Sequence, residues 1–520
     1  MNAAIQQLNN AFSLIVPEAV LLAAVCLIFF AAPFLVNERG EAPVGLRHRW
    51  GCLSLLALLM AGCVWWQSPP VTRTLGPFVL DELTWYIRGL TLTFGAILVL
   101  LHWNQADDAR SAESHACLLA ILAGVNLIAA SNDLVGLFVA LELVSIPTYL
   151  FLLLPRRDAP AQEATLKYFL LSIFSSAIVL FGMSYLYGAT GTTNLSGIHA
   201  AFSAATDHRA NPLVAVATVM LIAGLGFRLT AVPFHFYAPD VFQGAPTSAA
   251  AMLSFVPKIA GFVALLRLMV PATGAEQAMN PWTMTPAAIP LLWWLAVATM
   301  FVGNLMALMQ TDIRRLLAYS SVSHAGYMMV GLIVGMAHEH HKSDVVATVN
   351  PNSVSGIGAM LFYLAVYGAM TLGTFAVLIA SARADKRIET FDDLSGLSRT
   401  RPAMALLLAI FLFSLAGLPP TAGFLGKLNL FFAAWSQGAL EGQESYKWLA
   451  VILAINAALG AWYYLKIIGV MFLREPINRS QQDTVIETPS LIAAGLCLVG
   501  TLGLFFLPGW LWVPIQSIMP

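Results

Sequence analysis

The most constraining feature of this sequence is its succession of long apolar segments. A helix needs about 20 apolar residues to cross the hydrocarbon core of a bilayer, and by that rule the 520-residue chain contains about fourteen such segments. They begin near residues 11, 51, 83, 115, 134, 164, 213, 241, 289, 315, 356, 402, 447 and 489. Most connections between them are short, and no change in composition marks a separate soluble domain. The pattern predicts an all-α polytopic membrane protein with about 14 transmembrane helices.

Composition supports this prediction and excludes one class of partner. Only 10% of the residues are charged and 59% are hydrophobic, with a mean hydropathy of +0.77. Soluble domains contain about 25% charged residues. The formal net charge of -1 leaves no basic surplus to neutralise phosphates, which argues against nucleic acid as a partner.

The residues that usually hold cofactors are sparse or badly spaced. The five cysteines form no CxxC pair, which argues against a four-thiolate iron–sulfur cluster or a zinc ribbon. No glycine-rich nucleotide-binding fingerprint occurs. The stretch HEHH at 338–341 resembles a metal motif, but it falls in a predicted external loop without further ligands nearby, so a solvated loop is the better interpretation. We expect this chain to bind no metal, nucleotide or redox cofactor of its own.

Charge placement orients the predicted helices. The connections after odd-numbered helices hold fifteen Lys and Arg residues. The connections after even-numbered helices, with the helix ends beside them (Arg88 included), hold six. Because lysine and arginine concentrate in cytoplasmic loops, the odd-numbered connections are predicted to be cytoplasmic and both termini to lie on the outer face.

Ionisable side chains interrupt several of the apolar segments. Glu142 has at least seven uncharged residues on either side, Lys258 is central in the eighth predicted helix, and Lys427 follows a proline-rich interruption of the twelfth. A charge at the centre of a membrane helix opposes insertion by roughly 2.5–3.5 kcal/mol. Such groups usually mark proton or ion pathways, although a static pair between helices is the structural alternative.

Other polar residues are candidates for the same pathway. His324 lies in a serine-rich helix and could relay protons between the two lysines, or be a neutral structural histidine. His235 lies at the first proline-rich interruption and has the same two interpretations. Lys167 lies about one turn inside the sixth helix. Glu18 and Lys466 fit structural roles better, since the long stem of a lysine can reach the membrane interface.

Two segments interrupted by proline and glycine, 224–258 and 415–427, predict broken helices. Non-helical backbone at membrane depth persists only where protein or a water-filled cavity satisfies it. A pair of interrupted helices in corresponding halves points to the transport site of an inverted-repeat transporter. The expected divisions are N-terminal helices at 1–114, two inverted five-helix repeats at 115–270 and 289–473, and a C-terminal loop and helix at 474–520.

Five motifs resemble the antiporter-like membrane subunits of respiratory complex I. They are LELVSIPTY, EATLKYFLLS, GFRLTAVPFHFYAPDVFQGAPT, RRLLAYSSVSHAGY and LAGLPPTAGFLGK. The likeness covers residues 115–475 and is strongest around these motifs. The first three helices and the last are similar mainly in hydropathy.

The resemblance implies a charged axis at mid-membrane depth and a function for it. The implied members are Glu142, the position of Arg228, Lys258 and Lys427, with Lys167, His235 and His324 in supporting roles. The implied function is proton translocation in a bacterial NADH-quinone oxidoreductase of the inner membrane. NADH oxidation and quinone reduction would occur in partner subunits that hold FMN, iron–sulfur clusters and quinone. The implied partners are neighbouring antiporter-like and small membrane subunits, and the lipid bilayer.

One position departs from the family pattern, which has a lysine where this chain has Arg228. A guanidinium group keeps its proton at accessible pH, so Arg228 is expected to act as a fixed cation beside Glu142. Two rival functions stay open at this point: a subunit of a multisubunit cation/proton antiporter, which shares this fold and these lysines, and a scaffold whose charges are paired and static.

Overall fold

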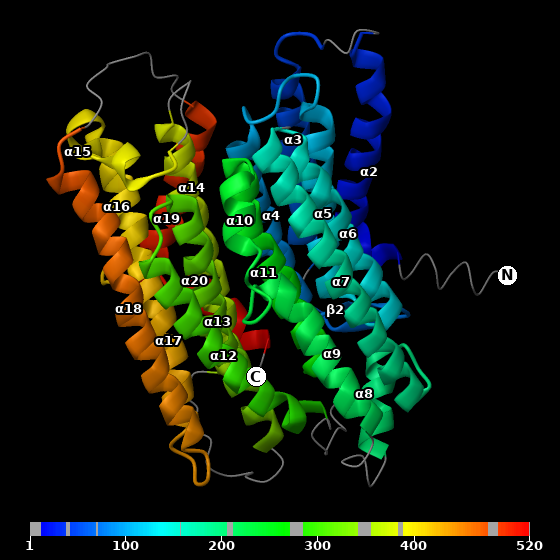
Figure 1. The fold of residues 1–520 in the computed structure, drawn as a ribbon. Coiled ribbons are helices and arrows are strands. Elements are labelled where there is room, and N and C mark those ends of the chain that lie inside the picture. Colours follow the sequence, from blue (N-terminus) through cyan, green and yellow to red (C-terminus); the bar gives the residue numbers. More distant parts are fainter. Residues whose placement is uncertain are drawn as a thin grey trace.

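The protein is described by a computed structural model for residues 12–37, 42–68, 71–156, 158–204, 212–270, 284–341, 355–382, 388–476 and 487–518. Nearly all of the described chain is helical (Figure 1). The longer helices are α2 (Val16–Ala31), α3 (Leu46–Gln67), α4 (Glu82–His102), α5 (Ser111–Ala130), α6 (Leu134–Leu153), α7 (Ala159–Thr190), α9 (Pro212–Leu229), α11 (Thr247–Met269), α12 (Met284–Leu308), α13 (Ile313–His341), α14 (Gly356–Ser381), α16 (Pro402–Ala416), α17 (Ala422–Gln437), α18 (Ser445–Leu473) and α19 (Thr488–Phe506). The shorter elements are η1 (Ser13–Ile15), η2 (Ala32–Leu35), the antiparallel strands β1 (Arg73–Leu75) and β2 (Phe78–Leu80), α8 (Leu195–Ala204), α10 (Ala238–Gly244), η4 (Phe391–Leu394), α15 (Leu397–Thr400) and α20 (Gly509–Ile518).

The predicted fold class is confirmed. In the described part of the chain, 13 helices are long and apolar enough to cross a membrane. The predicted interruption of the twelfth helix is confirmed, because this helix is built from α16 and α17, of 15 and 16 residues, separated at 417–421. This pair accounts for the difference between 13 long helices and the fourteen predicted segments. The predicted eighth helix is divided too, because α10 ends at Gly244 before α11 begins.

Helices from the first part of the chain and helices between residues 402 and 473 lie on opposite sides of a central layer. Figure 1 shows α2–α9, coloured blue to green, on one side and α16–α18, yellow to orange, on the other, with α10 and α11 between. The apolar windows of α11, α13 and α14 are completely buried inside the protein, whereas those of α2, α3 and α18 are only one-third buried. The protein core therefore lies along α11, α13 and α14, and the outer helices present their apolar side chains to their surroundings.

Close approach of α12 and α13 depends on two glycines. A Cβ atom at Gly303 would lie 2.6 Å from the backbone nitrogen of Ser323, and one at Gly326 would lie 2.6 Å from Cγ of Met300. Helices in membranes associate through close packing of small residues, because lipid provides no hydrophobic driving force between them. The two glycines thus hold α12 against the helix that carries His324.

A fully buried ion pair joins the first and third membrane helices. Arg88 Nε donates to Glu18 Oε1 at 2.7 Å, and Arg88 Nη2 donates to Glu18 Oε2 at 2.9 Å and to the carbonyl of Leu14 at 2.7 Å. Glu18 is 0% exposed and Arg88 1% exposed. The structural role expected for Glu18 agrees with this geometry. Placing Arg88 among the charges of loops and helix ends was wrong, because it lies inside α4 and is buried by its carboxylate partner.

We predict that Glu18→Gln destabilises the protein strongly. Removing one partner of a buried ion pair costs about 3–5 kcal/mol, because the other charge stays buried without compensation. The control is Arg399→Gln, which breaks an exposed pair with Glu475 whose side chains are 58% and 75% exposed. The free energy of unfolding of that variant should stay within about 0.5 kcal/mol of the parent value. Thermal unfolding in detergent tests both, and equal midpoints for the two variants would contradict the prediction.

Candidate functional site

Glu142 lies in α6 with a cation and two hydroxyl groups around it. Ser176 Oγ of α7 donates to Glu142 Oε1 at 2.5 Å, and Arg228 Nη2 of α9 lies 3.5 Å from the same oxygen. Arg228 Nη2 also donates to Ser145 Oγ at 2.8 Å. Ser145 is on the face of α6 that holds Glu142, since residues three apart are neighbours on a helix. The side chain of Arg228 is 4% exposed and that of Glu142 is 23% exposed. The arrangement makes Arg228 a buried, permanently charged neighbour of a carboxylate that reaches the protein surface.

Lys258 lies against the first helix break. The helix α9 ends at Leu229, and Thr230 follows with φ of 56°, a conformation that a β-branched residue rarely adopts. Lys258 Nζ donates to Thr230 Oγ1 at 3.1 Å, and Lys258 is 0% exposed. The C-terminal end of a helix carries partial negative charge, which favours a cation. The interrupted helix therefore provides both an oxygen ligand and a favourable field for the ammonium group.

Lys427 occupies the equivalent place at the second break. Its Nζ donates to the carbonyl oxygens of Leu415 at 2.8 Å and Ala416 at 3.0 Å, the last residues of α16. The chain then turns away through Gly417 at φ of 83°, where a Cβ atom would lie 2.9 Å from Cδ of Lys427. Lys427 Nζ also lies 5.2 Å from the centre of the Tyr327 ring, close enough for a cation–π interaction. Both lysines are thus bound at the C-terminal end of the first half of a broken helix.

His324 lies on α13, in the layer between the two lysines. Its Nδ1 is 2.7 Å from the hydroxyl of Tyr363 and its Nε2 is 3.0 Å from the hydroxyl of Tyr464. The Tyr464 hydroxyl in turn contacts Ser320 Oγ. Since both ring nitrogens have a hydroxyl partner, and a hydroxyl both donates and accepts, the imidazole can be hydrogen-bonded in either tautomer.

Hydroxyl and amide groups extend this network in both directions. Toward α11, Tyr367 donates to Ser321 Oγ at 2.9 Å, and Ser321 Oγ lies 3.5 Å from the carbonyl of Ser254, one turn before Lys258. Away from α11, Asn304 Nδ2 donates at 3.0 Å to the hydroxyl of Tyr327, whose ring faces Lys427. The polar residues of α13 therefore form a buried strip between the two lysine sites, of which Ser320, Ser321, His324 and Tyr327 are members.

Two of the predicted site residues, Lys167 and His235, contact groups other than the strip and the two buried lysines. Lys167 is 40% exposed and pairs with Glu163 at 2.7 Å and Asp240 at 2.8 Å, near one end of α7. His235 lies in the break before α10, with its ring centre 6.4 Å from that of Tyr319. Lys466 is exposed, with Nζ 4.8 Å from the centre of the Phe391 ring. The buried set of predicted residues consists of Arg228, Lys258, His324 and Lys427, together with Glu142 as the half-buried partner of Arg228.

Sequence reasoning relied on charges, histidines and the serine-rich stretch around His324, and it missed the neutral partners on other helices. Tyr363 and Tyr367 on α14, Tyr464 on α18 and Asn304 on α12 all contribute to the network and are at most 1% exposed. Their signal in the sequence is weak but present, because each is a polar group in the middle of an otherwise apolar segment.

No group of three or more His, Cys, Asp or Glu residues that could hold a metal ion occurs among the described residues. The side chains of 338–341, to which the metal interpretation applied, lie outside the described part.

Comparisons with known proteins relate the sequence and the fold to one family. Residues 131–452 match the family model described as NADH:quinone oxidoreductase/Mrp antiporter, TM. The chain is 35% identical to NADH-quinone oxidoreductase subunit N 1 of Solibacter usitatus over 95% of its own length and 94% of that protein. It is similar to a chain in the structure of respiratory complex I from Thermus thermophilus with bound aureothin, with a TM-score of 0.74, 28% identity and coverage of 96% and 99% of the two chains.

A further solved structure shares the fold alone. A chain of the Mrp complex from Dietzia sp. has a TM-score of 0.74 and 22% identity, with 97% of each chain covered. The family match includes both interrupted helices and all five residues of the buried set. The chain therefore belongs to the NADH:quinone oxidoreductase/Mrp antiporter transmembrane family.

Proposed function

We propose that this chain is a proton-translocating membrane subunit of an NADH-quinone oxidoreductase, of the subunit N type. The observation that carries the proposal is the buried succession from the Glu142–Arg228 pair through Lys258 and His324 to Lys427. Ionisable groups inside a membrane protein are expensive to bury and characteristically belong to proton pathways. The name of the Solibacter relative supports the assignment to this complex.

The chain acts in this proposal as part of a translocase. Partner subunits oxidise NADH, reduce quinone and hold FMN and iron–sulfur clusters, while this chain moves protons. Its partners are neighbouring membrane subunits, and its location is the bacterial inner membrane with both termini on the periplasmic side. The bacterial relatives and the bias of Lys and Arg toward the odd-numbered connections support this placement.

The mechanism is electrostatic coupling along the buried groups. Arg228 keeps its charge, so the variable member of the first pair is Glu142, whose partly exposed carboxylate is within reach of a neighbouring subunit. A unit charge about 6 Å away changes the energy of a second charge by about 2.8 kcal/mol at an effective dielectric near 20. That is about a 100-fold change in proton occupancy. A change at Glu142 thereby drives release of the Lys258 proton toward His324 and Lys427.

We also propose that the site belongs to two five-helix repeats, at 115–270 and 289–473, between an N-terminal unit at 1–114 and a C-terminal unit at 474–520. The parallel placement of Lys258 and Lys427 supports this division, because each binds at the C-terminal end of an interrupted helix. The polar strip on α13 then connects one repeat to the other.

A second candidate function is a subunit of a multisubunit cation/proton antiporter. The family description names both kinds of protein, which is the observation that keeps this candidate. The two functions differ in their companions. Copurification with flavin and iron–sulfur subunits supports the oxidoreductase, and their absence from an intact, ion-exchanging assembly supports the antiporter.

We predict that Glu142→Gln and Lys258→Met each lower proton pumping while the complex still assembles. The lost interaction is worth about 2.8 kcal/mol, so a decrease of about tenfold or more is expected. Pumping is measured by fluorescence quenching in inside-out vesicles driven by NADH, with assembly followed by native electrophoresis. Glu444→Gln, at an exposed position just before α18, is the control. Full pumping by both test variants would refute the proposed function.

Arg228 provides a test of the fixed-cation role. Arg228→Lys retains a charge beside Glu142, so its pumping rate should stay within about twofold of the parent rate. Arg228→Met removes the charge, and its pumping rate should fall as far as that of Glu142→Gln. In the double variant Glu142→Gln/Arg228→Met, the two losses should not add, because both remove the same interaction. Additive losses in this cycle would show that the two residues act independently.

His324→Phe tests the relay between the lysines. Phenylalanine fills the space beside the Tyr363 ring but accepts no proton, so pumping should fall by about 100-fold or more, the lower end of the range for a lost proton-transfer group. The exposed His48→Phe is the matched control. Unchanged pumping in His324→Phe, with a folded complex, would assign His324 a structural role only.

A further inference from the structure

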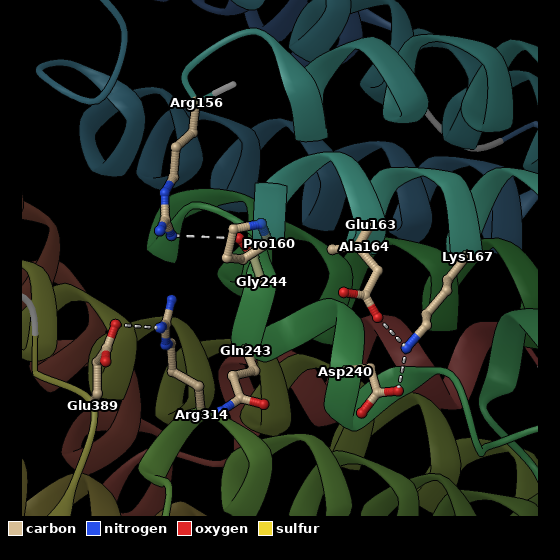
Figure 2. A pocket seen from close by; sticks show the side chains of 10 residues that line it. All are labelled: Arg156, Pro160, Glu163, Ala164, Lys167, Asp240, Gln243, Gly244, Arg314 and Glu389. Carbon is tan, nitrogen blue, oxygen red and sulfur yellow. Dashed lines mark hydrogen bonds and ion pairs between the residues drawn. The ribbon is translucent and has the colours of Figure 1, made fainter. Parts of the chain in front are cut away.

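A charged cavity lies beside α10, the short helix that follows the first break. Its volume is about 360 Å³, and it is lined by residues of α7, α10 and α13 together with Arg156 and Glu389. Figure 2 shows the Lys167 ammonium pointing between the carboxylates of Glu163 and Asp240 on one side of the cavity. The α6–α7 connection and the start of α13 border it, and both belong to the end of the protein that is expected to face the cytoplasm.

Asp240 joins the two sides of this cavity. Its Oδ2 accepts from Lys167 Nζ of α7 at 2.8 Å, and its Oδ1 accepts from Arg315 Nη1 of α13 at 2.6 Å. Gln243, one turn later on α10, accepts from the same Arg315 side chain at 3.0 Å. One carboxylate therefore ties α10 to helices that lie in different halves of the chain.

The ion pairs that Asp240 makes with Lys167 and Arg315 are weak enough to break reversibly. The Lys167 and Asp240 side chains are 40% and 38% exposed, and ion pairs with this degree of exposure are weak. Lys167 has a second partner, Glu163, at 2.7 Å, and Arg315 has a second partner, Gln310, at 3.2 Å. Both cations thus keep a hydrogen-bond partner when Asp240 moves away, and the Asp240 carboxylate is exposed enough for water to replace its ion pairs.

Movement of α10 would change the surroundings of Lys258, because the two are linked through the break. The break that ends at α10 begins at Thr230, whose hydroxyl holds Lys258. Inside the break, His235 Nδ1 is buried, and the His235 ring lies 6.4 Å from that of Tyr319 on α13. A titratable group thus lies in the stretch of chain that joins the cavity helix to the Lys258 site.

We propose that this cavity is the mouth through which cytoplasmic protons reach Lys258, and that Asp240 holds the mouth closed by bridging Lys167 and Arg315. His235, in the break behind Asp240, is the first proton carrier past the bridge. The proposal rests on the proposed function and assigns Lys167 to the gate instead of the buried axis. Asp240 is a positioning residue here, since it acts through the position of α10.

The first test is accessibility, which needs no pumping. In the intact complex in inside-out vesicles, a membrane-impermeant methanethiosulfonate reagent is applied to His235→Cys, with the parent chain as the labelling background because it contains native cysteines. Adding Asp240→Asn should raise the modification rate at position 235 by about tenfold, the size expected for the loss of two exposed ion pairs. Asp240→Glu should restore the slow rate.

The control Glu163→Gln also alters a partner of Lys167 but leaves the bridge from Asp240 to α13, and it should keep the slow modification rate. Equal modification rates with and without the Asp240→Asn substitution would overturn the gate.

The second test blocks the mouth. A bulky cationic thiol reagent on Glu163→Cys, applied from the cytoplasmic side, should lower proton pumping by at least half relative to the treated parent chain, and application from the other side should have no effect. Normal pumping after complete labelling would overturn the mouth. Lys258→Met separates this failure from failure of the proposed function: if Lys258→Met loses pumping while labelled Glu163→Cys does not, only the mouth is wrong, and if both pump normally, the proposed function is wrong.

Discussion

The structure depends on how an ammonium group is stabilised where water is scarce. A helix that runs uninterrupted through the membrane uses all of its carbonyl oxygens internally and has none to offer a lysine. At the end of α16 the last carbonyls are free, and two of them accept from Lys427. At the end of α9 the chain enters an unusual conformation at Thr230, whose hydroxyl accepts from Lys258. Interrupting a helix is therefore the means by which this protein holds a cation at depth.

The two kinds of buried charge in the protein have different consequences. Arg88 and Glu18 are each fully enclosed and are joined by two hydrogen bonds, and Arg88 also donates to the carbonyl of Leu14, so nothing nearby can change their state. Glu142 has only a 3.5 Å contact with Arg228, shares its oxygen with Ser176, and is partly exposed. The first arrangement suits a permanent link between helices, and the second suits a charge whose surroundings change. The distance between opposite charges alone does not distinguish a structural ion pair from a changeable one, whereas the burial of the two side chains does.

Neutral groups determine how the charged sites communicate. The lysines are not joined directly in the described structure, and the residues between them are serines, tyrosines and a histidine on α11, α13, α14 and α18. Three of these helices, α11, α13 and α14, form the most buried part of the fold, so the strip lies within protein and away from lipid. The tight contact at Gly303 and Gly326 keeps α13 in place against α12. Packing and the polar route are consequently properties of the same helices.

The sequence by itself determined the number and span of the helices and the presence of charges and breaks within them. This is because the bilayer demands long apolar segments and makes every exception to them conspicuous. It did not determine the partners. Glu18 pairs with Arg88 and Lys167 turns outward to Asp240, although both cations had been placed differently from sequence. The hydroxyls around His324 come from α14 and α18, far along the chain. A helix that is apolar on every side has no polar face to indicate which way it turns, so only the packing of helices against one another decided which side chains meet.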